Sequence, residues 1–446
     1  KVIHKPKFAK RATQHDKPPR LTIAIMRRYG RLFAMIPTAS NATAALRMTS
    51  LERRASLSLA SLFALRMLGL FLVLPVFALE AARYPGGANV AQVGLAFGIY
   101  GLAQACLQIP FGIASDRWGR KPVIIFGLVL FAAGSALAAA AQDIETLLMA
   151  RALQGSGAIS AAVTALLADL TRNSVRTKGI ALVGVSISLM FVLSLVIAPG
   201  LNAIIGLSGL FTLTAVLAGI GVFAVVFWVP KAPALRLRVN PLKGLRTVIQ
   251  NTQLLRLNFG VFSLHAIQLA MWMVIPDLLV QSGLIKVSHW QIYLPAVLGS
   301  LVVLGGVLFR LERRGYLRGV LLTAVACLGI AQVGFYAYLH TGATATWGGS
   351  SGLWFVGFLL FLFFIGFNAM EASQPSLVSK FVIPEYRGAA LGVFNTAQSL
   401  GFFVGGALGG WLLQVTSAQT VFAVCACWLL LWGAFVRGLQ PNQATH

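Results

Sequence analysis

The chain has 446 residues, of which 58% are hydrophobic and 11% are charged. An ordinary soluble domain carries about a quarter charged residues, so a soluble fold with this much apolar surface is excluded. The net charge of +25 would suit a nucleic-acid-binding protein, but the basic residues gather before residue 48 and in alternate loops between apolar stretches. That distribution indicates membrane topology rather than a phosphate-binding face, and we expect no nucleic-acid partner.

Residues 1–50 form a basic N-terminal extension. Residues 1–47 contain eleven lysines or arginines and one acid, Asp16. A strongly basic segment with prolines and only a short apolar patch near Ile23 to Met26 is expected to be largely disordered. It can be interpreted as an upstream extension that is not naturally translated, with the natural start at Met48, or as an arginine-rich targeting presequence. Its prolines and scattered charges favour the first interpretation.

Twelve apolar stretches follow this extension. A spanning helix needs ~20 apolar residues, and each stretch is long enough to provide them. The sequence therefore predicts an all-α membrane protein with twelve transmembrane helices in contact with the lipid bilayer. The predicted helices cover residues 57–80, 91–114, 122–141, 145–168, 179–205, 208–229, 255–281, 290–309, 318–340, 351–373, 388–414 and 419–436.

The loops between these stretches predict the orientation. The connections that follow the even-numbered helices carry eighteen basic residues, whereas the alternate loops carry two, Arg83 and Lys286. By the positive-inside rule, both termini are cytoplasmic.

The two halves of the chain resemble each other faintly. A shift of 211 positions aligns Gly155 with Gly366 and Arg176 with Arg387. Together with the topology, this favours the major facilitator type of fold, with two six-helix bundles around a site at the bilayer midplane. The predicted parts are a bundle at 51–229, a cytoplasmic basic linker at 230–253, a second bundle at 254–438 and a short polar tail at 439–446.

The sharpest motif lies between predicted helices 2 and 3. It runs from Gly112 to Pro122 with the sequence Gly-Ile-Ala-Ser-Asp-Arg-Trp-Gly-Arg-Lys-Pro. Its glycines permit a tight reversal, and the proline suits the first turn of a helix. Asp116 is not needed for orientation, so we expect it to pair with Arg120 four residues later or with a helix N-terminus. A purely structural turn is the alternative, and it leaves the acid unexplained.

This turn resembles the loop signature of the major facilitator superfamily. The segments 151–158 and 384–388 also match, and across about residues 48–438 the chain most resembles the YajR-type members of the twelve-helix drug:proton antiporter group. The resemblance implies that Asp116 and Arg120 form a cytoplasmic latch with Asp169. This latch is expected to meet the start of predicted helix 11 and to stabilise the outward-open state. The other latch candidates are Gly112, Arg117, Gly119, Lys121 and Arg387.

Ionisable residues inside the predicted spans are the second group of candidates, because burying a charge in a membrane is costly. The resemblance links Arg151 to proton coupling; a snorkelling anchor near the outer surface is the alternative. His265 could equally be an uncharged core histidine, and Asp277 and Glu371 could be interfacial. The candidates for proton coupling or for lining a cavity are Arg66, Arg151, His265, Asp277, Glu371, Asn368, Asn395 and Gln398.

These features predict a secondary active transporter, a monomer of the bacterial inner membrane that moves a small molecule by alternating access. The resemblance favours proton-coupled efflux of small amphipathic or drug-like molecules. The alternatives are a proton-coupled uptake symporter for a sugar or an organic acid, and a non-transporting receptor or scaffold. The sequence contains no ATPase-type glycine loop, zinc-binding helix pair or nucleophile triad, so we expect no enzymatic activity, cofactor or metal.

Overall fold

The computed structural model describes residues 48–230, 241–308, 310–311, 314, 316–342, 350–383 and 386–439. The regular elements in these ranges are all helices, and the described residues from Ser50 onwards belong to one compact unit. The predicted extension up to residue 47, residues 231–240 of the linker and residues 440–446 of the tail lie outside the described ranges.

The helices of the first half are α3 (Ser50–Val73), α4 (Phe77–Ala81), α5 (Val90–Trp118), α6 (Arg120–Ala140), α7 (Ile144–Gly155), α8 (Ser160–Asp169) and α9 (Asn173–Phe227). Of these, α5, α6 and α7 begin within two residues of the predicted limits, whereas α3 and α9 begin at Ser50 and Asn173, earlier than the predicted 57 and 179. Pro75 separates α3 from α4, because a proline ring removes a backbone donor and clashes with the preceding turn.

The helices of the second half also follow the apolar pattern. Residues 241–250 of the predicted linker are helical as well, and this helix packs on α18. The elements are α10 (Pro241–Gln250), α11 (Thr252–Trp272), α12 (Ile275–Gln281), the 3₁₀ turn η1 (Lys286–Ser288), α13 (Trp290–Val303), the π-helical turn η2 (Leu304–Leu308), α15 (Leu317–His340), α17 (Ser350–Lys380), α18 (Arg387–Val415) and α19 (Ala418–Arg437).

The predicted fourth helix, 145–168, is wrong as a single helix. The structure has two helices, α7 and α8, separated at residues 156–159. Glycines at this break allow close contact: a Cβ on Gly155 would lie 2.2 Å from the Tyr100 carbonyl oxygen, and one on Gly157 would lie 2.4 Å from that of Gly127. The break therefore brings backbone groups of this segment against α5 and α6.

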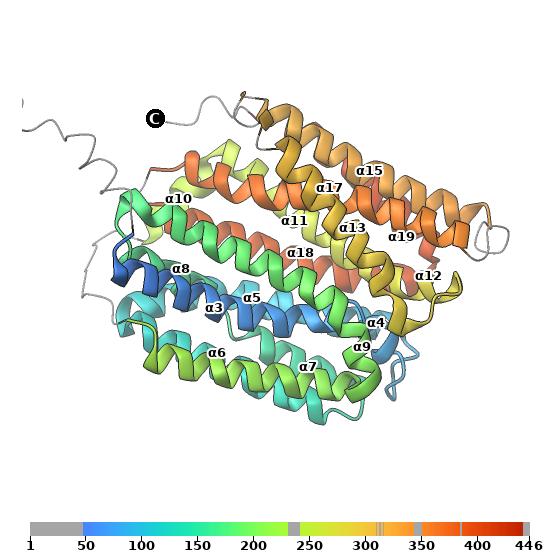
Figure 1. Cartoon of the computed structure of the whole chain (residues 1–446), viewed down its shortest axis with the longest axis horizontal. Helices are drawn as coiled ribbons and strands as arrows, with labels where there is room; N and C mark the ends of the chain where they lie inside the picture. Colours follow the sequence, from blue (N-terminus) through green and yellow to red (C-terminus); the bar gives the residue numbers. More distant parts are fainter. Residues whose placement is uncertain are drawn as a thin grey trace, which may run out of the picture. The chain divides into compact units, whose positions relative to one another are not determined.

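In the described part of the chain, ten helices are long and apolar enough to cross a membrane. The number falls below the predicted twelve for two reasons. Helices α7 and α8 are each too short to qualify, and α9 is assigned as one helix of 55 residues. Inside α9, Gly206 has a φ of +66°, a conformation that favours glycine, and the helix is kinked at this residue. Figure 1 shows that α9 changes direction within its length. The number twelve stays a prediction.

The two halves meet most extensively along α5 and α18, which lie side by side (Figure 1). We call the end of the helices that carries Arg83 and Lys286 the outer end, and the end that carries Arg120 and Lys380 the inner end. Towards the outer end, the contact consists of glycines: a Cβ on Gly94 would lie 2.4 Å from the carbonyl oxygen of Gly406. Backbone packs directly on backbone here, as in other small-residue helix pairs of membrane proteins.

Candidate functional site

The predicted latch residues lie together at the inner end. Helix α5 continues to Trp118, so Gly112 and Asp116 are helical, and Gly119 alone makes the reversal with a φ of +97°. Arg120 forms ion pairs with Asp116 and with Asp169, the second at 3.0 Å between Nε and Oδ2. The expected pairing of Asp116 with Arg120 is confirmed. Whether the cluster acts as a latch stays a prediction.

The remaining residues of the predicted latch have different surroundings. Arg117 is exposed, and Lys121 is half-buried in the first turn of α6. Arg387 donates from Nε to the carbonyl oxygen of Ser379 at 3.2 Å. The pKa of Arg176 is lowered by burial; Asp169 opposes this shift, and the positive charge of Arg387 adds to it. Arg387 therefore acts electrostatically on the region beside Asp169.

A further ion pair at the inner end was missed by sequence reasoning. Arg172, between α8 and α9, donates from Nε to the Glu52 carboxylate at 2.7 Å and from its backbone N–H at 3.0 Å. Glu52 is buried at the start of α3, and its hydrogen bond raises the pKa of Arg172. Glu52 was missed because it precedes the predicted first span, and only ionisable residues inside the spans were considered.

Arg66 lies in the middle of α3 and is 1% exposed. Its Nη2 donates to the Tyr100 hydroxyl at 2.9 Å, to Gln104 Oε1 at 3.2 Å and to the Gly157 carbonyl at 3.3 Å. The Gly157 carbonyl lies in the α7–α8 break, where it also accepts from the Ile159 backbone N–H at 2.9 Å. These partners are all uncharged.

Arg151 of α7 is also buried, so the snorkelling alternative is wrong. Its guanidinium carbon lies 4.9 Å from the Tyr100 ring centroid and 5.7 Å from that of Phe77, in cation–π geometry, and its Nη1 donates to Gln154. Tyr100 therefore contacts both buried arginines, through its hydroxyl and through its ring.

A polar chain leads from Arg66 across to the second half. Gln104 accepts from Arg66 and donates from Nε2 to the Ser399 hydroxyl of α18 at 3.0 Å. Ser399 in turn donates to the carbonyl of Asn395. Tyr100, Gln104 and Ser399 were not among the residues singled out from the sequence. Their polar side chains inside predicted membrane spans could have identified them from the sequence.

The second half contains a cluster around His265 of α11, which is buried. Its Nδ1 lies 2.9 Å from the Val261 carbonyl oxygen, which can only accept, so Nδ1 carries the proton in the neutral ring. Its Nε2 faces two groups: the Gln398 amide nitrogen at 2.8 Å and Glu371 Oε2 at 3.5 Å. Three predicted candidates from three helices thus meet at one ring nitrogen.

The other candidates lie apart from this cluster. Asn368 donates to the Ser300 hydroxyl of α13 at 2.8 Å. Asp277 is exposed near the outer end and accepts from Gln281 at 2.7 Å. Asp277 therefore lies outside the cluster around His265, and its role stays a prediction.

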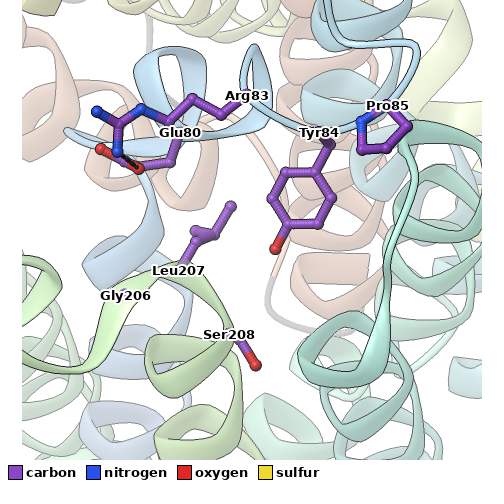
Figure 2. Close-up of a pocket in the computed structure, with 7 residues that line it drawn as sticks. All are labelled: Glu80, Arg83, Tyr84, Pro85, Gly206, Leu207 and Ser208. Carbon is purple, nitrogen blue, oxygen red and sulfur yellow. Dashed lines mark hydrogen bonds and ion pairs between the residues drawn. The ribbon is translucent and has the colours of Figure 1, made fainter.

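At the outer end, the two halves share an ion pair. Glu80 of α4 accepts from Lys286 of η1 at 2.9 Å and from Arg83 at 3.1 Å. Figure 2 shows Glu80 and Arg83 beside a pocket of about 330 Å³, which Tyr84 and Leu207 also line. Burial and the Glu80 carboxylate raise the pKa of Tyr84. At the outer end, the halves are thus joined by an ion pair, by the glycine contact of α5 with α18 and by a hydrogen bond from the Val90 N–H to Gln414.

Long apolar helices, a buried polar zone between two halves and ion pairs at both ends define a multi-pass membrane protein of the transporter type. The family model described as Major Facilitator Superfamily matches residues 59–406 and 312–445. The chain therefore belongs to the major facilitator superfamily, a family of membrane transporters, and the predicted resemblance is confirmed.

Individual proteins agree with this assignment. The inner membrane transport protein YajR of Escherichia coli K12 is 39% identical over 389 residues, which cover 86% of this chain and 83% of that protein. The multidrug resistance protein MdtH of Proteus mirabilis is 27% identical and covers 78% of this chain and 84% of its own. The crystal structure of the human organic anion transporter MFSD10 has a TM-score of 0.63 at 19% identity, covering 87% of this chain and 100% of that one, which shows likeness of fold alone.

Proposed function

We propose that this chain is a proton-coupled secondary transporter of the bacterial inner membrane that exports small amphipathic molecules by alternating access. The observation that carries the proposal is the contact between the halves at the outer end. Glycine surfaces on α5 and α18, the ion pair of Glu80 with Lys286 and the hydrogen bond from the Val90 N–H to Gln414 Oε1 join the halves there. Such a contact has few interlocking side chains, so it can part and re-form as the halves rock.

The proposed topology has twelve spans with both termini in the cytoplasm. At 1.5 Å per residue a straight α9 would be about 80 Å long, against a hydrocarbon core of ~30 Å. The break at Gly206 supports counting two spans. Helices α7 and α8 run over residues 144–169 and together supply a further one. The excess of basic residues in the inner loops supports the orientation.

Cysteine labelling tests this topology. In a background without the four native cysteines, Arg83→Cys should react with an impermeant maleimide added outside intact cells. Arg117→Cys, exposed in the reversal between α5 and α6, should react only after the membrane is opened. The same two variants in permeabilised cells are the control for intrinsic reactivity. Labelling of position 117 but not 83 from outside would reverse the orientation.

Proton coupling is proposed to centre on His265. In the neutral ring, Nε2 accepts from Gln398 of α18; once protonated, it donates to Glu371 of α17 instead. Protonation of His265 therefore replaces its hydrogen bond to α18, the helix that contacts α5, by an ion pair to α17. Among the described residues, Glu371 is the titratable group that faces this ring.

Transport by proteoliposomes tests the coupling. With an imposed pH gradient and a panel of dyes, antibiotics and sugars, at least one lipophilic dye or drug should move against the proton flow. His265→Gln and Glu371→Gln should reduce gradient-driven transport at least about tenfold, whereas substrate exchange without a gradient should change less than about twofold, because binding and rocking survive.

Asp277→Asn is the matched control, since this acid is exposed and lies outside the cluster. Full gradient dependence in both His265→Gln and Glu371→Gln would remove the proposed proton site. Movement of a sugar or organic acid together with the proton flow would instead identify an uptake symporter. The export direction is supported by the similarity to multidrug resistance proteins such as MdtH.

A further inference from the structure

Two buried guanidinium groups flank Tyr100 without an acidic partner. Among the described residues, the ion pairs involve Glu52, Glu80, Asp116, Asp169 and Glu371, and none of these carboxylates pairs with Arg66 or Arg151. The Nε atoms of both arginines are buried and have no hydrogen-bond acceptor in the described structure. The first half thus holds two uncompensated positive charges at one place.

An arrangement of this kind is costly unless something else supplies the negative charge. Buried charges in proteins are normally paired, and inside a membrane a lone arginine marks a functional site. The neutral acceptors around Arg66 bind its two Nη atoms but leave its charge in place. A ligand carboxylate would supply both the charge and two parallel acceptors for the planar guanidinium fork.

Arg66 is connected through Gln104 to the interface between the two halves, whereas Arg151 contacts the ring of Tyr100. Gln104 contacts Arg66 with its amide oxygen and Ser399 of the other half with its amide nitrogen. When the halves part, the hydrogen bond to Ser399 must break, and Gln104 can turn away from Arg66. Its amide oxygen occupies the position where an incoming carboxylate oxygen would be held.

We propose that Arg66, supported electrostatically by Arg151, binds the anionic group of the transported molecule, so that the substrate class is the amphipathic organic carboxylates. The inference rests on the proposed transport function and deepens it by naming the substrate class. Phe402, which is half-buried beside His265 in the second half, offers aromatic surface to the apolar part of such a molecule.

Calorimetric binding to the purified full-length chain in detergent micelles at pH 7.5 tests the proposal without any gradient. The probes are 2-naphthoate and decanoate, each compared with its neutral amide of nearly the same shape. Each acid should bind at least about tenfold more tightly than its amide. In Arg66→Gln, the affinities for acid and amide should differ by less than about twofold. Arg66→Lys should keep part of the preference for the acid, because the positive charge remains while the planar guanidinium fork is lost.

Arg437→Gln, which removes an exposed arginine at the end of α19, is the control and should leave the ratio unchanged. Equal binding of acid and amide by the unaltered chain, or no binding of either acid, would overturn the proposal whether or not the variants fold. So would an acid preference that survives in Arg66→Gln. Acid-selective binding without gradient-driven transport would leave the anion site standing and refute proton-coupled transport, so the two failures are distinguishable.

Discussion

Gly406→Ala should lower transport about tenfold or more by preventing the outer end from closing. The added Cβ would lie 2.7 Å from the Gly98 backbone nitrogen and 2.8 Å from the Gly94 carbonyl oxygen. Real Cβ atoms do not approach backbone so closely, so α18 must move away from α5, and overpacking of this kind costs ~1–3 kcal/mol. That cost falls on the closed state alone, and it shifts the resting population towards an open outer end.

Gly392→Ala on the same helix is the control, because its Cβ would meet nothing within 4 Å. Both substitutions raise helix propensity equally, so propensity cannot explain a difference between them. The measurement combines transport in proteoliposomes with spin-label distances between the outer ends of α5 and α18. We expect lengthened distances in Gly406→Ala and unchanged ones in Gly392→Ala. Normal transport and unchanged distances in both variants would show that the glycine contact is not an obligatory closure.

Arg120→Gln should have the second large effect, a fall in transport of about tenfold. Arg120 joins the α5–α6 turn to the end of α8 through Asp116 and Asp169. The Asp169 side chain is 18% exposed and that of Asp116 is 52% exposed. Because solvent screens exposed pairs, Asp169→Asn should impair transport more than Asp116→Asn does. Ligand binding should largely survive in each, since Asp116, Arg120 and Asp169 lie at the inner end, whereas Arg66 lies in the middle of its helix.

Arg117→Gln removes an exposed charge from the same turn and serves as the control. Spin labels at the inner ends of α5 and α18 report the conformation directly. Their separation should increase in Arg120→Gln if the ion pairs hold α8, which contacts α18, in place and so keep that end closed. The pairs between Arg120 and the two acids can be weighed by double-mutant cycles. Unchanged distances with normal transport would mean that these residues form only a turn and a basic anchor, and the latch proposal would have to be withdrawn.

The amino-acid sequence by itself determined the class of protein and most helix positions. A spanning helix must be apolar over ~20 residues, and that requirement is local, so α5, α15, α18 and α19 lie within a few residues of their predicted limits, apart from the continuation of α5 through Trp118. The family also followed from contiguous residues around Asp116 and Arg151, and the family match confirms it. The pairing of Asp116 with Arg120 was predictable because the two residues are four positions apart.

Only the tertiary structure decided which polar groups meet. The partners of Arg66 are 34 to 94 positions away in sequence, and Gln104 is 295 positions from Ser399. At the break between α7 and α8, Gly155 and Gly157 pack against the backbone of α5 and α6, a contact that hydropathy does not encode. Hydropathy reports how each segment partitions into a bilayer, whereas the choice of hydrogen-bond partners depends on the rotation and crossing of helices distant in sequence.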